Sequence, residues 1–294
     1  FVDYLVEQCG KNVIVAGLDG TYEGKPFGHV VELLPMSEKF VKLPAVCLDC
    51  GDDASFTVRR SNFSGNREKI EVIGGNDLYE SLCRSCRAKR KNKNLDISPS
   101  HMATGKLIVV TGPMYAEKST YLQRHVRRME LGGKKCLIIK HAYDIRYDKP
   151  NDCCTHDLLT MPAIATKSLW EHIDQCKNYD VIALDEIQFF SEIVEFVEEL
   201  VENMGKIVIV AGLDGTYEGK PFGRVAELLP MSEKFIKLSA VCLDCCGDAS
   251  FTVRRPDFSG DREKVEVIGG NDLYESLCRS CRAKRRNKVS NISS

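Results

Sequence analysis

The segment from Leu107 to Thr120 constrains the fold of this chain more than any other part of its sequence. Its first residues form an apolar run typical of a buried strand, and a loop that begins at Gly112 follows. The loop ends in Lys118 and Ser119, where a helical pattern begins. A strand, a glycine-initiated loop and a helix in this order are the context of a phosphate-binding loop. We therefore expect a nucleotide-binding fold in which backbone amides of residues 112–119 surround phosphate oxygens.

Glu117 departs from the usual phosphate-loop pattern, which has glycine just before the lysine. A carboxylate there would repel each phosphate charge by roughly 1 kcal/mol at about 4 Å in water, and by about 4 kcal/mol where screening is poor. In the alternative, the side chain points to solvent and pairs with a nearby cation. The sequence leaves both outcomes open.

An internal repeat divides the chain. Residues 1–93 align without gaps with residues 196–288, and 77 of these 93 positions are identical. A solenoid is disfavoured because solenoid repeats run about 20–50 residues, far less than this separation. We predict the C-terminal part of a truncated first unit over 1–91, a polar linker over 92–104, a phosphate-loop domain over 105–239, a cysteine-rich subdomain over 240–288 and a tail over 289–294.

Alternating strand and helix patterns in the second unit predict an α/β fold, a parallel sheet with helices on both faces. Residues 141–168 are expected to be irregular and polar, and ASFTVRR and KVEVIGG to form a strand pair. Because the first unit lacks strands to flank Val13–Gly17, we expect residues 1–93 to be mobile apart from their cysteine pairs. The expected strands are Lys106–Thr111, Lys135–Lys140, Val181–Leu184 and Ile207–Leu213, and the helices Lys118–Leu131, Leu169–Cys176 and Ile193–Asn203.

The composition excludes several classes of protein. The chain is 43% hydrophobic and 28% charged, as globular proteins are, and its net charge of −1 gives no global field for nucleic acid or anionic membranes. Its longest apolar runs are too short to span a bilayer. The start, FVDYLVEQCG, is typical of a helix cut mid-way rather than of a signal peptide. We expect a cytoplasmic protein whose partners are neither nucleic acid nor membrane.

The motif LDEIQFF, from Leu184 to Phe190, supplies acids to the predicted sheet. An acid that ends a strand near a phosphate loop has the Walker B arrangement, so Asp185 would hold Mg²⁺ directly or through water. Glu186 lies one residue further, at the end of the strand where ligands bind in such sheets. A carboxylate there can accept the proton of an attacking hydroxyl. An acid pair that starts a helix is the alternative, but the upstream loop favours the catalytic interpretation.

Paired cysteines predict a metal site. Two Cys-x-x-Cys knuckles lie 32 residues apart in the second unit, which is a Cys₄ zinc signature. Without a histidine or an open position, the zinc would be structural, and free core cysteines are the alternative. This use of cysteine argues against disulfides and favours a reducing compartment. The ligands would be Cys242, Cys245, Cys278 and Cys281, and in the partial unit Cys47, Cys50, Cys83 and Cys86.

Together these motifs resemble the zinc-containing, cellular-type (type II) thymidine kinases, which include tandem-duplicated members in trypanosomatid-type parasites. The resemblance lies in GPMYAEKST, KHAYDIRY, CCTHD, LDEIQFF, AGLDGTYEGKPFG, VCLDC, EVIGGNDLY and CRSC, in family order over Lys106–Cys281. It implies a RecA-like phosphate-loop fold and ATP- and Mg²⁺-dependent phosphorylation of thymidine, and of deoxyuridine-like nucleosides, at the 5′-hydroxyl. It further implies a role in pyrimidine salvage for DNA synthesis, feedback binding of dTTP, and a homo-oligomer or an assembly of tandem units.

The resemblance also implies roles for single residues. Glu186 would be the general base, and Val265–Gly269 would belong to a lasso loop whose backbone binds the thymine edge and whose ends the zinc clamps. Glu117 stands where the family has glycine, and Arg254–Lys264 looks longer than the usual lasso stem. The ATP and Mg²⁺ site would comprise Gly112, Pro113, Met114, Tyr115, Ala116, Glu117, Lys118, Ser119, Thr120, Asp144, Arg146, Asp185 and Gln188. The thymidine site would comprise Met114, Phe189, Leu213, Tyr217, Phe222, Thr252, Val265, Glu266, Val267, Ile268, Gly269 and Tyr274.

Two functional hypotheses follow. The full set of motifs, with Glu186, favours an active thymidine kinase. Glu117 and the truncated first unit favour a catalytically impaired unit that serves assembly or nucleoside binding. A third interpretation, a zinc ribbon that binds nucleic acid, depends only on the cysteines and the basic segment Arg279–Lys288, for which a solvated tail is the simpler explanation.

Overall fold

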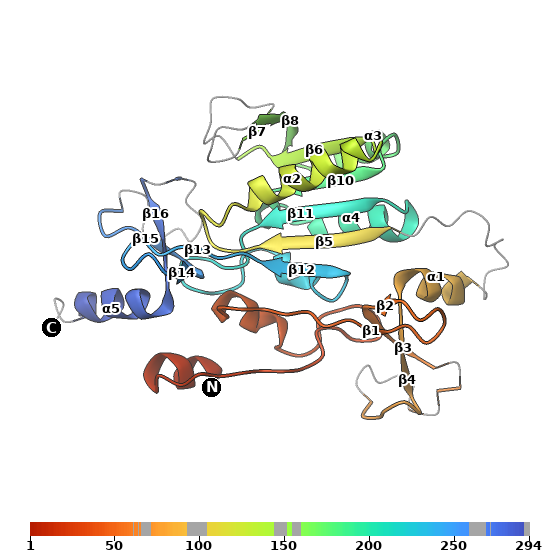
Figure 1. Cartoon of the computed structure of the whole chain (residues 1–294), viewed down its shortest axis with the longest axis horizontal. Helices are drawn as coiled ribbons and strands as arrows, with labels where there is room; N and C mark the ends of the chain where they lie inside the picture. The colour runs from red at the N-terminus through yellow and green to blue at the C-terminus, as the bar shows by residue number, and fades with distance from the viewer. Residues whose placement is uncertain are drawn as a thin grey trace.

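A six-stranded parallel sheet, in the order β12-β5-β11-β10-β6-β9, forms the centre of the molecule (Figure 1). This computed structural model describes residues 1–60, 62–63, 65, 72–92, 105–143, 152–154, 160–258, 269–270 and 272–290. The α/β sheet expected from the sequence is confirmed. Its strands are β5 (Lys106–Thr111), β6 (Cys136–His141), β9 (Ile164–Thr166), β10 (Val181–Asp185), β11 (Ile207–Gly212) and β12 (Lys234–Lys237).

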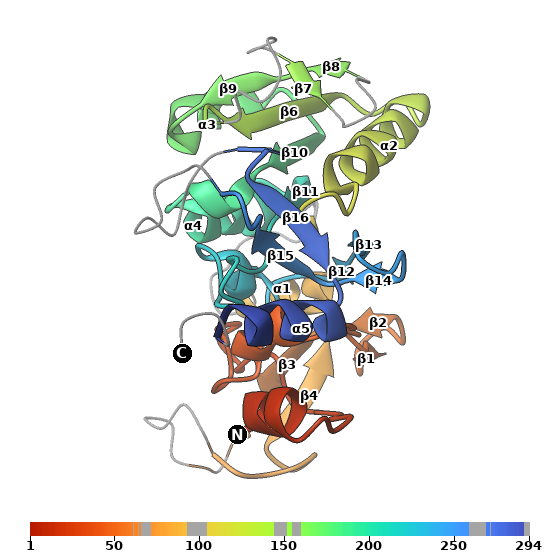
Figure 2. The ribbon, with the colours of Figure 1, turned by 90° about the vertical axis from the view of Figure 1, so that its left-hand side faces the viewer.

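Continuous apolar strands are buried because helices cover both faces of the sheet. Ile108 and Val110 of β5 pack in one core with Leu122 of α2 (Lys118–Leu131). The alternate residues Leu107 and Val109 of β5 face the other core, which includes residues of α4 (Ile193–Glu198). Helices α2 and α4 accordingly lie on opposite sides of the sheet (Figure 2).

The segment between β6 and β10 is more regular than the sequence suggested. Residues 141–168 were expected to be an irregular loop, but β7 (Asp152–Cys154) pairs with β8 (Thr160–Pro162) within it. In addition, β9 extends the central sheet by pairing with β6. These strands have three residues each, too few to show a period in the sequence.

Two expected helices are composite. The first consists of a 3₁₀ turn, η4 (Leu169–His172), and α3 (Ile173–Cys176). The second begins as α4 and ends in a wider turn, η6 (Glu199–Asn203). Within the described part of the chain, no helix is both long and apolar enough to cross a membrane.

The cysteine-rich subdomain follows β12. It consists of β13 (Ala240–Val241), β14 (Asp248–Ala249), β15 (Phe251–Arg254), β16 (Tyr274–Leu277) and α5 (Arg279–Ser290). The structure gives β15 a different partner from the expected KVEVIGG, because β15 pairs antiparallel with β16. Residues 264–268 of KVEVIGG lie outside the described residues.

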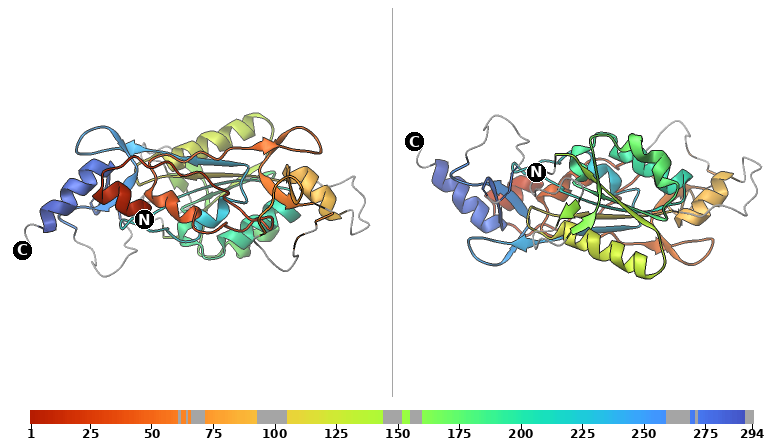
Figure 3. Two further views of the ribbon diagram at one scale, coloured as in Figure 1. Left: turned by 90° about the horizontal axis from the view of Figure 1, so that it is seen from below. Right: turned by 90° about the horizontal axis from the view of Figure 1, so that it is seen from above.

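The first unit repeats this subdomain. In it β3 and β4 pair in the same register as β15 and β16, and α1 corresponds to α5. The two subdomains lie at opposite ends of the molecule, as the positions of α1 and α5 show (Figure 3). The elements of this unit are η1 (Tyr4–Gln8), η2 (Val31–Met36), β1 (Ala45–Val46), β2 (Asp53–Ala54), β3 (Phe56–Arg59), β4 (Tyr79–Leu82) and α1 (Arg84–Asn92).

Packing within the first unit is uneven. Val31 and Leu34 of η2 are buried in the core of the second unit, where they pack with Val225 and Leu229. In contrast, Val13–Gly17 forms no strand, and Ile14 is 96% exposed. The packed parts of this unit therefore extend beyond its cysteine pairs.

Candidate active site and zinc centres

The phosphate loop joins β5 to α2 through a backbone that needs positive φ at three positions. These are Gly112 at 146°, Tyr115 at 67° and Glu117 at 57°. A Cβ at Gly112 would lie 2.4 Å from the carbonyl oxygen of Leu238, so this glycine is required for packing as well as for conformation. The helix begins at Lys118, as the sequence predicted.

Glu117 affects the loop through its backbone. Its side chain is exposed, in agreement with the alternative in which it points to solvent. Among the described residues, however, no cation forms an ion pair with it. The left-handed conformation costs an L-residue roughly 1–2 kcal/mol, a cost that glycine avoids. The conformation of residue 117 thus explains why glycine suits this position.

Lys118 folds back over the loop. Its Nζ donates a hydrogen bond of 2.7 Å to the carbonyl oxygen of Pro113. Ser119 and Thr120 are half-buried in the first turn of α2, at the positive end of the helix dipole. A cation, hydroxyls and backbone amides are thus gathered where an anion would bind.

The acidic pair lies at the carboxyl end of β10. Asp185 is buried, and its Oδ1 accepts a hydrogen bond of 3.0 Å from the amide of Glu186. Its Oδ2 accepts one of 3.3 Å from the thiol of Cys153. Glu186 is also buried, with φ of 54°, so it too holds a left-handed conformation. Cys153 gave no spacing signal in the sequence, because its contact with Asp185 depends on the pairing of β7.

Gln188 holds the carboxylate of Glu186. Its Nε2 donates a hydrogen bond of 2.6 Å to Glu186 Oε2, while its Oε1 accepts one of 3.0 Å from the amide of Leu213. Gly212 leaves room for this arrangement, since a Cβ there would lie 2.7 Å from Gln188 Oε1. Gln188 was predicted to belong to the ATP and Mg²⁺ site, and in the structure its side chain lies against Glu186.

Four of the predicted thymidine-site residues meet in one apolar cluster, which we call the pocket cluster. It also contains Phe258 and Leu273, which the sequence did not single out because isolated apolar residues resemble ordinary core. The phosphate loop is attached to β15 and β16 by hydrogen bonds from Met114 N to Thr252 Oγ1, at 2.9 Å, and from Tyr115 Oη to the Tyr274 carbonyl, at 3.1 Å. The members of the pocket cluster are Met114, Tyr115, Leu213, Tyr217, Phe258, Leu273 and Tyr274.

The remaining predicted aromatic residues form a second group. The rings of Phe189 and Phe222 meet edge to face, with centroids 5.6 Å apart. His141, which the sequence did not single out, packs against Phe189 and Phe190. Its Nδ1 accepts a hydrogen bond of 3.1 Å from the amide of Tyr143, and burial lowers its pKa.

Of the predicted lasso residues, the structure describes Gly269, which is half-buried. Six predicted site residues lie outside the described part of the chain: Asp144, Arg146, Val265, Glu266, Val267 and Ile268.

A buried ion pair lies under the loop that follows β11. Lys237 Nζ of β12 lies 2.7 Å from Asp214 Oδ2, and their side chains are only 1% and 4% exposed. The same Nζ donates a hydrogen bond of 2.5 Å to the carbonyl oxygen of Leu34 in the first unit. Since Asp214 follows Leu213 in sequence, Lys237 connects the first unit to the pocket cluster.

Both predicted cysteine sets assemble. Within each set, the four Sγ atoms lie within 4.8 Å of one another. The distances from Cys245 to Cys278 and from Cys50 to Cys83 are both 3.7 Å between sulfurs. Tetrahedral zinc with Zn–S bonds of about 2.3 Å would place sulfurs about 3.8 Å apart, so both sets fit zinc.

In the second-unit set one cysteine, Cys242, is shifted toward its thiolate form, whereas its hydrogen bond with Cys278 raises the pKa of Cys281 to about 12. Burial opposes ionisation of Cys242, but backbone amides of Cys278, Asp244 and Cys245 outweigh it and lower its pKa to about 6. Thiolate is the form that binds a metal ion.

Comparison with known proteins gives a consistent result. A sequence model of the thymidine kinase family matches residues 2–87 and 105–282. The thymidine kinase of rabbit fibroma virus (strain Kasza) is 45% identical over 180 residues, which cover 61% of this chain and 97% of that protein. The cytosolic thymidine kinase of Homo sapiens is 46% identical over 188 residues, 64% of this chain and 77% of that protein.

Among solved structures, the replication initiator DnaA bound to AMPPCP and single-stranded DNA covers 52% of this chain and 44% of its own, with 15% identity. Its TM-score of 0.31 is too low to support any argument. The family model matches most of the chain, and the viral protein is matched over nearly its whole length. The chain therefore belongs to the thymidine kinase family.

Proposed function

We propose that this chain transfers the γ-phosphoryl group of ATP to the 5′-hydroxyl of thymidine, giving dTMP and ADP. The observation that carries the proposal is the buried Glu186 carboxylate, held by Gln188 at 2.6 Å. It lies at the carboxyl edge of the sheet, where β5 leads into the phosphate loop and β11 into the pocket cluster. A fixed carboxylate between the phosphate loop and an apolar cluster suits a general base for a nucleoside hydroxyl.

In this mechanism, Glu186 accepts the proton of the 5′-hydroxyl as its oxygen forms a bond to the γ-phosphorus. The bond from the γ-phosphorus to the bridging oxygen breaks, and ADP leaves with the electron pair. Lys118 is released from the Pro113 carbonyl to neutralise phosphate oxygens. Backbone amides at the start of α2 hold the remaining charge.

The residues present fit Mg²⁺, which prefers oxygen ligands. Asp185 offers a buried carboxylate and Ser119 a hydroxyl, and either could act through water. When bound with ATP, Mg²⁺ neutralises charge on the β- and γ-phosphates.

The pocket cluster would hold the thymine ring, together with Phe189 and Phe222. A lasso over 265–269 would bind the edge of the base, and the zinc set Cys242, Cys245, Cys278 and Cys281 would clamp its ends. Deoxyuridine-like nucleosides, which lack the thymine methyl group, would lose roughly 1–3 kcal/mol of apolar contact. We further infer a function in pyrimidine salvage for DNA synthesis, with feedback binding of dTTP.

A second candidate is a unit that binds thymidine but transfers phosphate poorly. The left-handed Glu117 favours it, because strain in the phosphate loop would weaken ATP binding while the pocket cluster stays intact. In that case the two tandem units, residues 1–91 and 105–288, would serve assembly.

Two measurements separate these candidates. The first is formation of dTMP from thymidine and ATP by the wild type and by Glu186→Gln, which should lose roughly 10²–10⁴-fold in kcat. The second is thermal stabilisation by thymidine without ATP. Formation of dTMP that depends on Glu186 supports the active kinase. Thermal stabilisation by thymidine without dTMP formation supports the binding unit. If neither dTMP formation nor stabilisation is seen, both candidates are refuted.

A further inference from the structure

The guanidinium of Arg254 lies over two aromatic rings of the pocket cluster. Its Cζ atom is 3.8 Å from the ring centroid of Tyr217 and 4.3 Å from that of Phe258. A guanidinium within about 6 Å of an aromatic centroid is attracted by the negative face of the ring. Arg254 ends β15 and is half-buried, so water screens this attraction less than at an open surface. Arg254 therefore contacts two members of the pocket cluster at once.

The two rings come from different parts of the second unit. Tyr217 lies in the loop after β11, and Phe258 follows β15 at the start of the segment that leads to the proposed lasso. The Phe258 amide donates a hydrogen bond of 3.1 Å to the carbonyl oxygen of Arg255. The Phe258 ring also meets that of Tyr274 edge to face, with centroids 5.9 Å apart. Arg254 thus connects the loop after β11 to the segment that leads into the lasso.

The first unit repeats this arrangement. The Cζ atom of Arg59 lies 3.8 Å from the ring centroid of Tyr22 and 4.5 Å from that of Phe63. The Phe63 ring meets that of Tyr79 edge to face, again with centroids 5.9 Å apart. The sequence of residues 1–91 contains no phosphate loop. The side chains and strand pairing of the cysteine-rich subdomain therefore place the arginine without help from the phosphate loop.

The surroundings of the two arginines differ. In the second unit, Tyr217 and Phe258 pack with Met114 of the phosphate loop and with Leu213. In the first unit, Leu18 is the counterpart of Leu213 and is 55% exposed. The same contact between a cation and two rings thus occurs with a packed pocket cluster in one unit and beside an exposed leucine in the other.

We propose that Arg254 is a positioning residue of the thymidine site. Its guanidinium holds the loop that carries Tyr217 against the segment that carries Phe258 before the nucleoside binds, so less conformational freedom is lost on binding. The inference rests on the proposed function, because it concerns the cluster that would hold the thymine ring. Since proton transfer and phosphate binding are assigned to other residues, Arg254 should affect the affinity for thymidine rather than kcat.

Arg254→Met tests this role, because it keeps an unbranched side chain and removes the cation. In the full chain we expect the Kd for thymidine, measured by calorimetric titration without ATP, to rise roughly 10-fold. At saturating thymidine and ATP, kcat should stay within about two-fold of the wild type. A residue that only stabilised the fold would not divide its effect between Kd and kcat in this way.

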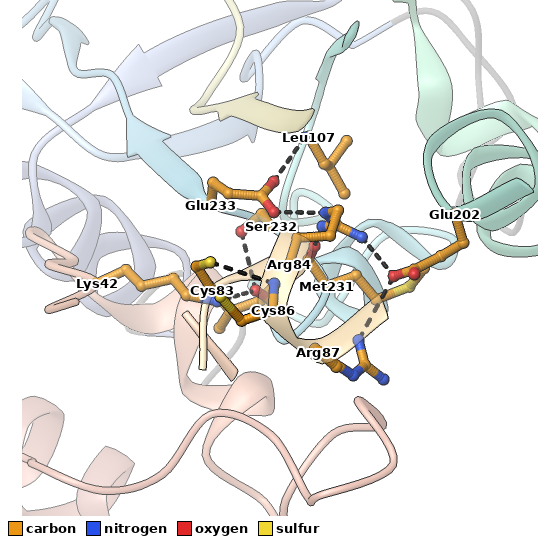
Figure 4. Close-up of polar contacts among 11 residues, drawn as sticks. Lys42, Cys83, Arg84, Cys86, Arg87, Leu107, Glu202, Met231, Ser232 and Glu233 are labelled. Carbon is orange, nitrogen blue, oxygen red and sulfur yellow. Dashed lines mark hydrogen bonds and ion pairs between the residues drawn. The ribbon is translucent and has the colours of Figure 1, made fainter. Parts of the chain in front are cut away.

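Arg59→Met is the matched control. It removes the equivalent contact in the first unit and should change neither the Kd for thymidine nor kcat. The contact between the units stays intact in this variant, because Arg84 still donates to Glu233, to Glu202 and to the carbonyl oxygen of Met231 (Figure 4).

Phe258→Leu tests the contact itself. If Arg254 acts through the rings, the effects of Arg254→Met and Phe258→Leu on the binding free energy should be less than additive in the double variant. A cooperative unfolding transition shows that each variant is folded. If Arg254→Met is not, Arg254→Lys replaces it with a smaller expected rise in Kd, because an ammonium group does not stack on a ring.

Three results would overturn the inference while leaving the proposed function in place, provided that the wild type binds thymidine. They are an unchanged Kd in the Arg254 variant, an equal rise in Arg59→Met, and full additivity of Arg254→Met with Phe258→Leu. A wild type that does not bind thymidine overturns both the inference and the proposed function.

Discussion

Gln188 and Glu186 form a hydrogen-bonded pair of 2.6 Å at the carboxyl end of β10. The other end of the Gln188 amide is fixed by the Leu213 backbone at 3.0 Å. Gln188 thus connects Glu186, the proposed base, to the backbone of Leu213 directly after β11.

Gln188→Met should therefore lower kcat more than it raises the KM for thymidine. Loss of both hydrogen bonds leaves the Glu186 carboxylate without its positioning contact, and a small misplacement costs roughly 10- to 100-fold in rate. Steady-state kinetics of the two variants Gln188→Met and Glu186→Gln give the comparison. A wild-type kcat in Gln188→Met would show that the contact has no role in positioning.

Glu117→Gly should relieve the left-handed strain of the phosphate loop. We expect the free energy of unfolding to rise by about 1 kcal/mol and the KM for ATP to fall. Glu117→Ala is the matched control, since it removes the charge but keeps the side-chain strain. If Glu117→Ala lowers the KM for ATP as much as Glu117→Gly does, the carboxylate of Glu117 and not its backbone conformation weakens ATP binding in the wild type. Denaturant unfolding and ATP titration measure the two effects.

Lys237→Met should both destabilise the protein and weaken thymidine binding. The variant leaves the buried Asp214 carboxylate unpaired, which costs about 3–5 kcal/mol. Asp214 adjoins Leu213 of the pocket cluster, so the KM for thymidine should rise. Lys42→Met breaks the equivalent pair with Asp19 in the first unit, far from this cluster in sequence, and serves as the control. Equal thymidine KM values in the two variants would contradict the proposed coupling.

Cys245→Ser should remove one of two bound zinc ions per chain. Elemental analysis should find about one zinc in this variant, and a lower Tm should follow because β15, β16 and the lasso lose their clamp. Cys246→Ser is the neighbouring control, since Cys246 is exposed and outside the set. Retention of two zinc ions by Cys245→Ser would exclude the assigned ligand set.

His141 should make stability fall in mild acid. Burial lowers its folded-state pKa below the ordinary value of 6.5, so the unfolded chain takes up a proton first as pH falls. Stability is lost as pH falls from about 6.5 through the lower folded-state pKa. His141→Asn retains an acceptor near Nδ1 but cannot titrate, so its unfolding free energy should depend less on pH in this range. Identical pH dependence in the two proteins would exclude His141 as the source.

The motifs with a fixed local geometry could be predicted from the sequence. The helix bounds Lys118–Leu131 are as expected, and both Cys₄ sets assemble, because short-range spacing alone fixes a helix start and a cysteine knuckle. The hydrogen bond from the Leu213 amide to Gln188 and the contact of Cys153 with Asp185 could not be predicted. Each depends on which strands become neighbours, and sequence spacing carries no record of that.

The segments Val13–Gly17 and Val208–Gly212 show most clearly what local sequence cannot predict, since both have the sequence VIVAG. In the second unit this sequence is the buried strand β11, with Ile209 at 0% exposure between β5 and β10. In the first unit Ile14 is 96% exposed and the segment forms no strand. The sequence by itself determined the phosphate loop, the acidic pair and the cysteine sets. Tertiary structure alone decided whether VIVAG became a strand, because a parallel strand needs neighbours to accept its hydrogen bonds and cover its side chains.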